Sequence, residues 1–191
     1  MVAAGLLAVA FAAVIGAAVL RLRGHYFAIA TLGVLLAAQQ VSRIIGITGG
    51  ASGKILLDVP QGTVFYYLFF GVLVAEMAVV YYLSNTRFGF ILNAIRDDEE
   101  KATAMGFNTA YHKTAAWMLA ALFTGLAGGG YSLFNTFLNP QTAYNSAWNV
   151  ELIAMALLGG SGTVAGPVIG AFGLHTLIEF VETAFVGWQL V

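Results

Sequence analysis

The stretch VAAGLLAVAFAAVIGAAVL, residues Val2–Leu20, decides the fold class of this chain because all nineteen of its residues are apolar. A helix needs about 20 mostly apolar residues to cross a bilayer. Three further stretches have a similar length and character: Tyr26–Ile45, Val64–Leu83 and Thr114–Phe134. Since hydrocarbon leaves no water to satisfy an open backbone, such stretches cross as helices. The sequence therefore predicts a polytopic helical membrane protein.

The C-terminal stretch 149–188 is long enough for nearly two spans, but Gly159, Gly160 and Gly162 interrupt it. We expect a short helix, a break at the glycines, and a longer helix ending near residues 179–187. The predicted fold is thus an all-α transmembrane bundle, with about five to six membrane helices or half-helices. We expect residues 1–191 to form a single transmembrane domain.

The composition agrees with a bilayer as the solvent, because 60% of the residues are hydrophobic and only 9% are charged. A net charge of −1 argues against a nucleic-acid partner, which requires a basic surface. The chain contains no cysteine, which excludes disulfides and thiolate chemistry.

Basic residues in the short loops predict the orientation of the spans. Alternation of the predicted spans places six basic residues on one side and two on the other: Arg21, Arg23, Arg87, Arg96, Lys101 and Lys113 against Arg43 and Lys54. The side with six is predicted to be cytoplasmic, so residue 1 begins outside. Because the first basic residue follows the first apolar run, the leader of a signal peptide is missing. Either the first span is a reverse-oriented anchor, or further membrane helices precede this sequence; we expect the second.

Glycines give two sets of candidate residues. Gly162, Gly166 and Gly170 recur every four residues, a spacing that lets two helix backbones approach closely. Glycine-rich breaks at 46–53 and 159–166 each follow an apolar run, and broken helices at membrane depth often line a substrate path. The candidates for that path are Thr48, Gly49, Gly50, Gly159 and Gly160. Helix packing remains an alternative for each glycine.

Motifs for catalysis or cofactor binding are incomplete. The segment TGGASGKI, residues Thr48–Ile55, resembles a phosphate-binding loop but has Thr at the place of the first glycine and Ile at the place of the final Ser or Thr. The three histidines are scattered over different segments, without metal-ligand spacing. We predict no catalytic residue, no metal and no cofactor.

Six consecutive charged residues, Arg96–Lys101 (RDDEEK), stand in a polar loop of residues 84–113 between two predicted spans. The composition of 90–107 favours a short helix that stops at Gly106, with the four acidic residues in its early turns. Small side chains at Ala102 and Ala104 would let this helix enter a cleft on another protein. A solvated loop helix without a partner is the alternative that such charge runs usually represent.

Several blocks of the sequence, in order and over most of its length, resemble the permease subunits of branched-chain amino acid ABC importers, the LivH/LivM family. The blocks are RLRGHYFAIATLG (Arg21–Gly33), TGGASG (Thr48–Gly53), TRFGFILNAIRDDEEKATAMG (Thr86–Gly106), KTAAWMLAALFTGLAG (Lys113–Gly128) and LLGGSGTVAGPVIGA (Leu157–Ala171). The charged block and LGGSGTVAGP are the specific ones.

The resemblance implies a non-enzymatic, multi-pass subunit in the inner membrane of a prokaryote. Its implied partners are a second permease subunit, cytoplasmic ATP-binding subunits and an external substrate-binding protein. Segment 94–106 is similar to the coupling helix that docks into the ATPase subunit, which would place six residues at that contact: Arg96, Asp97, Asp98, Glu99, Ala102 and Gly106. We expect Gly106→Trp or Ala102→Arg to uncouple transport while membrane insertion survives.

Three other functions remain open from the sequence. One is a membrane structural or assembly protein that uses only its glycine faces. Relatives of this family carry urea or short amides, so the substrate is less certain than the ABC machinery. Glu76 lies in the middle of a predicted span, where a carboxylate is costly and is a functional candidate by default. It would carry the coupling proton if the chain were instead a secondary transporter.

Overall fold

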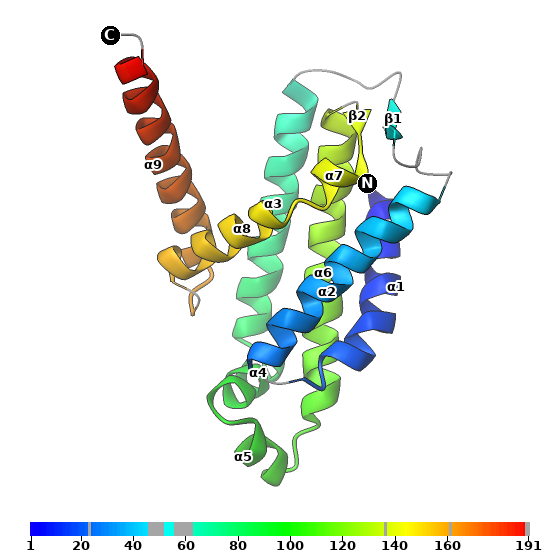
Figure 1. The fold of residues 1–191 in the computed structure, drawn as a ribbon. Helices are drawn as coiled ribbons and strands as arrows, with labels where there is room; N and C mark the ends of the chain where they lie inside the picture. The colour runs from blue at the N-terminus through cyan, green and yellow to red at the C-terminus, as the bar shows by residue number, and fades with distance from the viewer. Residues whose placement is uncertain (23, 46–51, 56–62, 136, 161, 190–191) are drawn as a thin grey trace. The chain divides into compact units, whose positions relative to one another are not determined.

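A computed structural model describes residues 1–22, 24–45, 52–55, 63–135, 137–160 and 162–189. The chain forms two compact units, Met1–Tyr144 and Asn145–Val191, and each is described by itself. Figure 1 shows their helices in chain order.

Four long helices build the first unit: α1 (Val2–Val19), α2 (His25–Ile44), α3 (Thr63–Ser84) and α6 (Thr109–Phe134). They contain 18, 20, 22 and 26 residues, and each is long and apolar enough to cross a membrane. These four helices confirm the four spans predicted upstream of residue 149. Large apolar side chains cover their outer faces, such as Val14 at 74% exposed and Tyr66 at 68%, as lipid-facing surfaces require. The chain is a multi-pass membrane protein.

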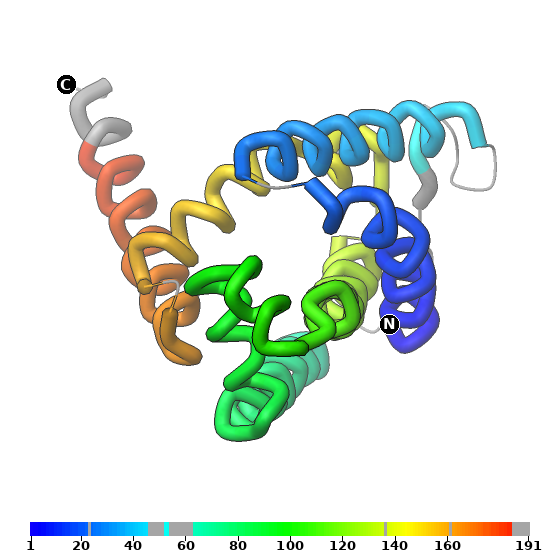
Figure 2. The backbone as a smooth tube through the Cα atoms, turned by 90° about the horizontal axis from the view of Figure 1, so that it is seen from below, coloured from blue at the N-terminus to red at the C-terminus, as the bar shows by residue number. Residues whose placement is uncertain are grey.

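The tightest helix pair of the first unit is α1 with α6, which lie side by side in Figure 2. A Cβ atom at Gly125 would lie 2.5 Å from the Cβ of Ala8, and one at Gly129 would lie 2.7 Å from the Cβ of Ala4. Small residues therefore let the two backbones approach, which is how helices associate where lipid removes the hydrophobic driving force.

Shorter elements lie at the two ends of the first unit (Figure 1). At one end, α4 (Arg87–Asp97) and α5 (Glu99–Ala104) fill the loop between α3 and α6. At the other end, β1 (Lys54–Ile55) pairs antiparallel with β2 (Phe137–Leu138), and α7 (Pro140–Ala143) follows. The sequence predicted loops at this second end; the strand pair was missed because two-residue strands carry no periodicity.

The second unit is a pair of packed helices, α8 (Ser146–Gly159) and α9 (Gly166–Gln189). The predicted short helix, glycine break and longer helix are confirmed. Asn145 begins α8, and its side-chain oxygen accepts a hydrogen bond from the amide of Ala147 at 3.0 Å. The longer helix continues to Gln189, beyond the predicted end at 179–187.

Candidate functional site

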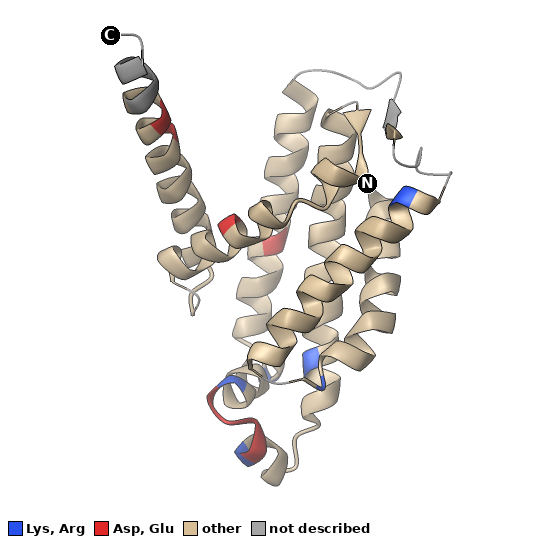
Figure 3. Ribbon diagram, in the orientation of Figure 1, with Lys and Arg blue, Asp and Glu red and all other residues tan. Residues whose placement is uncertain are grey.

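The charged loop forms two helices rather than the single one predicted from the sequence. Figure 3 shows its acidic and basic residues gathered along α4 and α5, whereas the long helices carry few charges. The backbone leaves the helical region at Asp98 (φ −161°, ψ 106°), so α4 ends at Asp97 and α5 begins at Glu99. Asp98 is the N-cap of α5, accepting hydrogen bonds from the amides of Glu100 at 3.0 Å and Lys101 at 3.1 Å.

Gly106 ends α5, as predicted. Its φ of +87° lies in the left-handed region, which glycine occupies without steric cost. The amide of Gly106 donates to the carbonyl oxygen of Thr103 at 2.9 Å, and the amide of Phe107 donates to that of Ala102 at 3.2 Å. These two bonds form a Schellman motif. Both ends of α5 are therefore fixed by local hydrogen bonds.

Ala102 does not lie on the surface of the loop. Ala102 is 1% exposed, so its side chain faces the interior of the chain. This differs from the prediction from the sequence, which placed Ala102 at the contact with the ATPase subunit. A small residue is required there because the six-residue helix packs against its own protein. Exposed side chains of the loop include Arg96 at 61%, Asp97 at 71% and Lys101 at 83%, together with Met105 at 66%. Glu100 and Ala104 are exposed as well. The sequence did not point to Lys101 or Met105 as contact residues.

An ion pair joins the loop to a spanning helix. The Nζ of Lys113, in the second turn of α6, lies 2.8 Å from the Oε1 of Glu99, the first residue of α5. Both side chains are mostly covered, at 23% and 24% exposed. Two neighbouring pairs stay within the loop: Arg96 with Asp97 at 3.3 Å, and Lys101 with Asp98 at 3.0 Å.

The electrostatics of the loop favour ionised Asp98. The hydrogen bond from the backbone amide of Lys101 lowers the pKa of the Asp98 carboxyl below its usual value, and the Lys101 side chain contributes further. Glu99 and Glu100 follow in the first turn, where carboxylates suit the positive end of the helix. The acidic run thus has a structural role at the start of α5 in addition to any contact with a partner.

The glycines of the second unit lie at the crossing of α8 and α9. A Cβ atom at Gly159 would lie 2.7 Å from the amide nitrogen of Gly170 and would overlap the carbonyl group of Gly166. Gly166 and Gly170 are buried, whereas Gly162 is exposed in the turn before α9. Gly162 therefore does not share a helix face with the other two, because the helix begins only at Gly166.

Only some of the residues predicted for a translocation path lie in the described part of the chain. Thr48, Gly49 and Gly50 lie outside the described residues. Gly159 ends α8, and Gly160 follows as its C-cap with φ +101° and an amide that donates to Leu157 at 3.3 Å. Gly160 has open space around it, since a Cβ atom there would meet only the Thr163 hydroxyl, at 3.9 Å.

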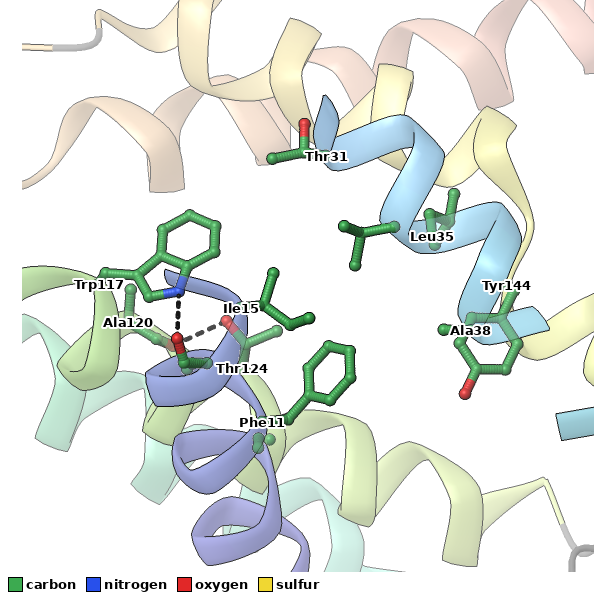
Figure 4. A pocket seen from close by; sticks show the side chains of 14 residues that line it. Phe11, Ile15, Thr31, Leu35, Ala38, Trp117, Ala120, Thr124 and Tyr144 are labelled. Carbon is green, nitrogen blue, oxygen red and sulfur yellow. Dashed lines mark hydrogen bonds between the residues drawn. The ribbon is translucent and has the colours of Figure 1, made fainter. Parts of the chain in front are cut away.

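A cavity lies in the first unit, between α1, α2 and α6 (Figure 4). It has a volume of about 470 Å³ and a lining that is almost entirely apolar. Its few polar groups are used within the chain: Trp117 Nε1 donates to Ala12 at 3.2 Å, and Thr124 donates to Ala120 at 2.9 Å. This cavity could not be predicted from the sequence, because apolar residues on three separate helices carry no local signal.

Glu76 faces a smaller hollow of about 260 Å³ between α3, α4 and α6, where it is half-buried. Asn93 of α4 lines the same hollow. The carboxylate is therefore turned toward other helices rather than fully toward lipid, which is the usual arrangement for an ionisable residue at this depth.

The profile of a protein family described as "Branched-chain amino acid transport system / permease component" matches residues 1–189. The chain belongs to this family. The match includes both compact units of this chain and the charged loop, and it confirms the resemblance found in the sequence. No solved structure gives a significant match.

Individual relatives agree with the family. The chain is 27% identical over 217 residues to the high-affinity branched-chain amino acid transport system permease protein LivM of Escherichia coli, covering 94% of this chain and 49% of the relative. The LivM of Salmonella typhimurium is 27% identical over 206 residues, covering 88% and 47%. The autoinducer 2 import system permease protein LsrC of Yersinia pseudotuberculosis is 31% identical over 111 residues, covering 55% and 31%. This chain therefore spans about half the length of the LivM relatives it matches.

Proposed function

We propose that this chain is a membrane-spanning permease subunit of an ATP-driven importer for branched-chain amino acids. It moves the substrate inward while a partner subunit hydrolyses ATP. The single observation that carries this function is the family match over residues 1–189, which includes the charged loop. The LivM relatives are named for branched-chain amino acids, and they cover more of this chain than the LsrC relative does.

We further propose that the loop of residues 84–113 is cytoplasmic and that α4 and α5 dock on the ATP-hydrolysing subunit. The outward side chains Arg96, Asp97, Lys101 and Met105 supply both signs of charge and one apolar anchor. Asp98 and Gly106 fix the two ends of α5 and thereby hold this surface in shape. ATP-driven closure of the partner shifts the population of the membrane helices through this contact.

The remaining assignments follow the family. Residues 1–191 act as one permease domain, in which α8 is a half-helix and α9 a further span. A second permease subunit and an external substrate-binding protein complete the importer in the inner membrane of a prokaryote. Gly160 is proposed to lie on the translocation path, because its backbone is non-helical and the space around it is open. Gly159, which precedes it and packs on α9, is proposed to lie beside that path.

Co-purification of the permease component with its ATP-hydrolysing subunit, followed by leucine uptake in proteoliposomes, tests this function. Met105→Asp places a carboxylate on the proposed docking surface, and Gln141→Asp places the same group on exposed α7 at the opposite end of the first unit. We expect the first variant to lose the partner and the second to retain it. Absence of any nucleotide-hydrolysing partner from the unsubstituted, correctly inserted complex would refute the function.

A further inference from the structure

A helix as short as α5 does not hold its orientation by itself. It has six residues, well below the roughly 12–15 residues at which isolated helices become marginally stable in water. Its end caps fix its length, but they are hydrogen bonds within residues 98–107 and do not attach it to the membrane helices. The direction of α5 therefore depends on contacts with the rest of the chain.

The contact between Glu99 and Lys113 provides such an attachment. Glu99 is the first residue of α5, and Lys113 lies one turn inside α6, a helix of 26 residues that ends at Phe134. The 2.8 Å pair is mostly covered by protein, so solvent screens it less than the exposed Arg96–Asp97 pair. Arg96–Asp97 and Lys101–Asp98 each join residues of the loop to one another, and neither of them reaches a spanning helix.

Lys113 also lies where the loop meets the end of α1. It lines one hollow with Leu92 and Arg96 of the α4 region, and a second, of about 330 Å³, with Glu99, Gly16 and Arg21. A displacement of α5 would therefore change contacts at Lys113, where α4, α5, α6 and the end of α1 meet.

Movement of α6 is in turn passed to α1. Gly125 and Gly129 bring the two backbones into close contact, and Trp117 of α6 donates to the carbonyl oxygen of Ala12 at 3.2 Å. Closely packed helices move together because dense packing leaves no space for one to slide independently.

From these contacts we infer that the Glu99–Lys113 ion pair is a link by which movement of the docked α5 reaches α6 and α1, in addition to the packing of Ala102. This inference rests on the proposed function and deepens it, since it assigns positioning roles to two residues of the loop. Lys113 touches neither substrate nor nucleotide in this role. It converts a shift of the loop into a shift of a spanning helix.

The test uses the complete importer in proteoliposomes and measures substrate uptake and ATP hydrolysis in the same sample. Lys113→Met removes the charge and keeps an apolar stem, Lys113→Arg keeps the charge, and Glu99→Lys with Lys113→Glu reverses the pair. We expect Lys113→Met to retain the ATP-hydrolysing subunit. The amount of substrate moved per ATP hydrolysed should fall by a factor of about five or more, since fivefold is the lower end of the usual coupling between two sites. Lys113→Arg should recover most of the ratio, and the reversed pair part of it, because a lysine at position 99 no longer suits the positive end of α5.

Two results overturn the link. One is an unchanged ratio of substrate to ATP in Lys113→Met; the other is loss of the ATP-hydrolysing subunit from that variant, which would mean that the pair only maintains the docking surface. Failure of the proposed function has a different signature, because the unsubstituted complex would then bind no such subunit.

Discussion

Gly170 of α9 lies against Gly159 of α8 at a distance that leaves no room for a side chain. A Cβ atom at Gly170 would lie 2.7 Å from the amide nitrogen and 2.9 Å from the Cα of Gly159. Gly173, on the same helix, has no atom within 4 Å of such a position. Gly170 is therefore a position where a substitution should disturb the helix crossing, and Gly173 is the matched control position.

Gly170→Ala is expected to destabilise the packing of α8 on α9 by about 1–3 kcal/mol, the usual cost of overpacking. Gly173→Ala should leave stability unchanged or raise it, because alanine favours helix and the space is open. Thermal unfolding of the purified complex in detergent, followed by size-exclusion chromatography, measures both. Equal melting temperatures for the two variants would contradict the close crossing.

The α1–α6 contact predicts a second pair of outcomes. Gly125→Leu introduces a side chain where even a Cβ atom would lie 2.5 Å from that of Ala8, whereas Gly128 has open space. We expect Gly125→Leu to lower the yield of folded protein and its melting temperature, and Gly128→Leu to resemble the parent. If both variants insert and melt alike, α1 and α6 do not pack through this face.

Gly106 tests the shape of the docking surface. Space is not limiting there, since nothing lies within 4 Å of a Cβ atom, but its φ of +87° penalises any L-residue. Gly106→Val should cost about 1–2 kcal/mol of local stability and reduce retention of the ATP-hydrolysing subunit, while membrane insertion stays normal. Asparagine tolerates the left-handed region better than other residues, so Gly106→Asn should be milder. Pull-down of the partner with each variant checks the order.

Asp98 predicts a pH dependence of the loop. Because hydrogen bonds to its carboxylate lower its pKa in the folded protein, ionised Asp98 stabilises α5 fully above the ordinary aspartate pKa. That contribution is lost as the pH falls through the lowered value. Hydrogen exchange of the amides of Glu100 and Lys101 should therefore accelerate, relative to the intrinsic rate, only in acid. Asp98→Ala should remove the protection at every pH, whereas Asp98→Asn, still a good N-cap, should keep part of it without the acid transition.

Glu76 distinguishes the ATP-driven importer from a proton-coupled transporter. Glu76→Gln keeps the shape of the side chain in its hollow but cannot release a proton. ATP-driven uptake in proteoliposomes should persist in this variant and should not require a pH gradient. Uptake that depends on a pH gradient and disappears in Glu76→Gln would favour the secondary transporter.

Much of the fold followed directly from the sequence. The four spans could be predicted because the thickness of the bilayer sets the length of apolar sequence that a spanning helix needs. The break between α8 and α9 followed from clustered glycines, and the end of α5 from Gly106, since these are local backbone effects. The family was also recognised from the order of its sequence blocks.

The differences at the charged loop and one omission on α6 have separate causes. Ala102 was expected on the surface, yet it is 1% exposed, because six residues of α5 do not show which face packs inward. Asp98 was placed inside a helix although its side chain caps a new one. The Gly125-x-x-x-Gly129 spacing on α6 was a usable packing signal that the sequence analysis did not apply.

The sequence by itself determined which segments cross the membrane, where charge gathers and where the backbone breaks. These properties depend on composition and on neighbours in the chain. Only the tertiary structure decided that α1 packs on α6, that Lys113 meets Glu99, and that an apolar cavity of about 470 Å³ lies between α1, α2 and α6. The physical reason is that a helix such as α1, apolar on every face, carries no polarity pattern to set its rotation. Its partners are chosen by close steric fit between segments that are distant in the sequence.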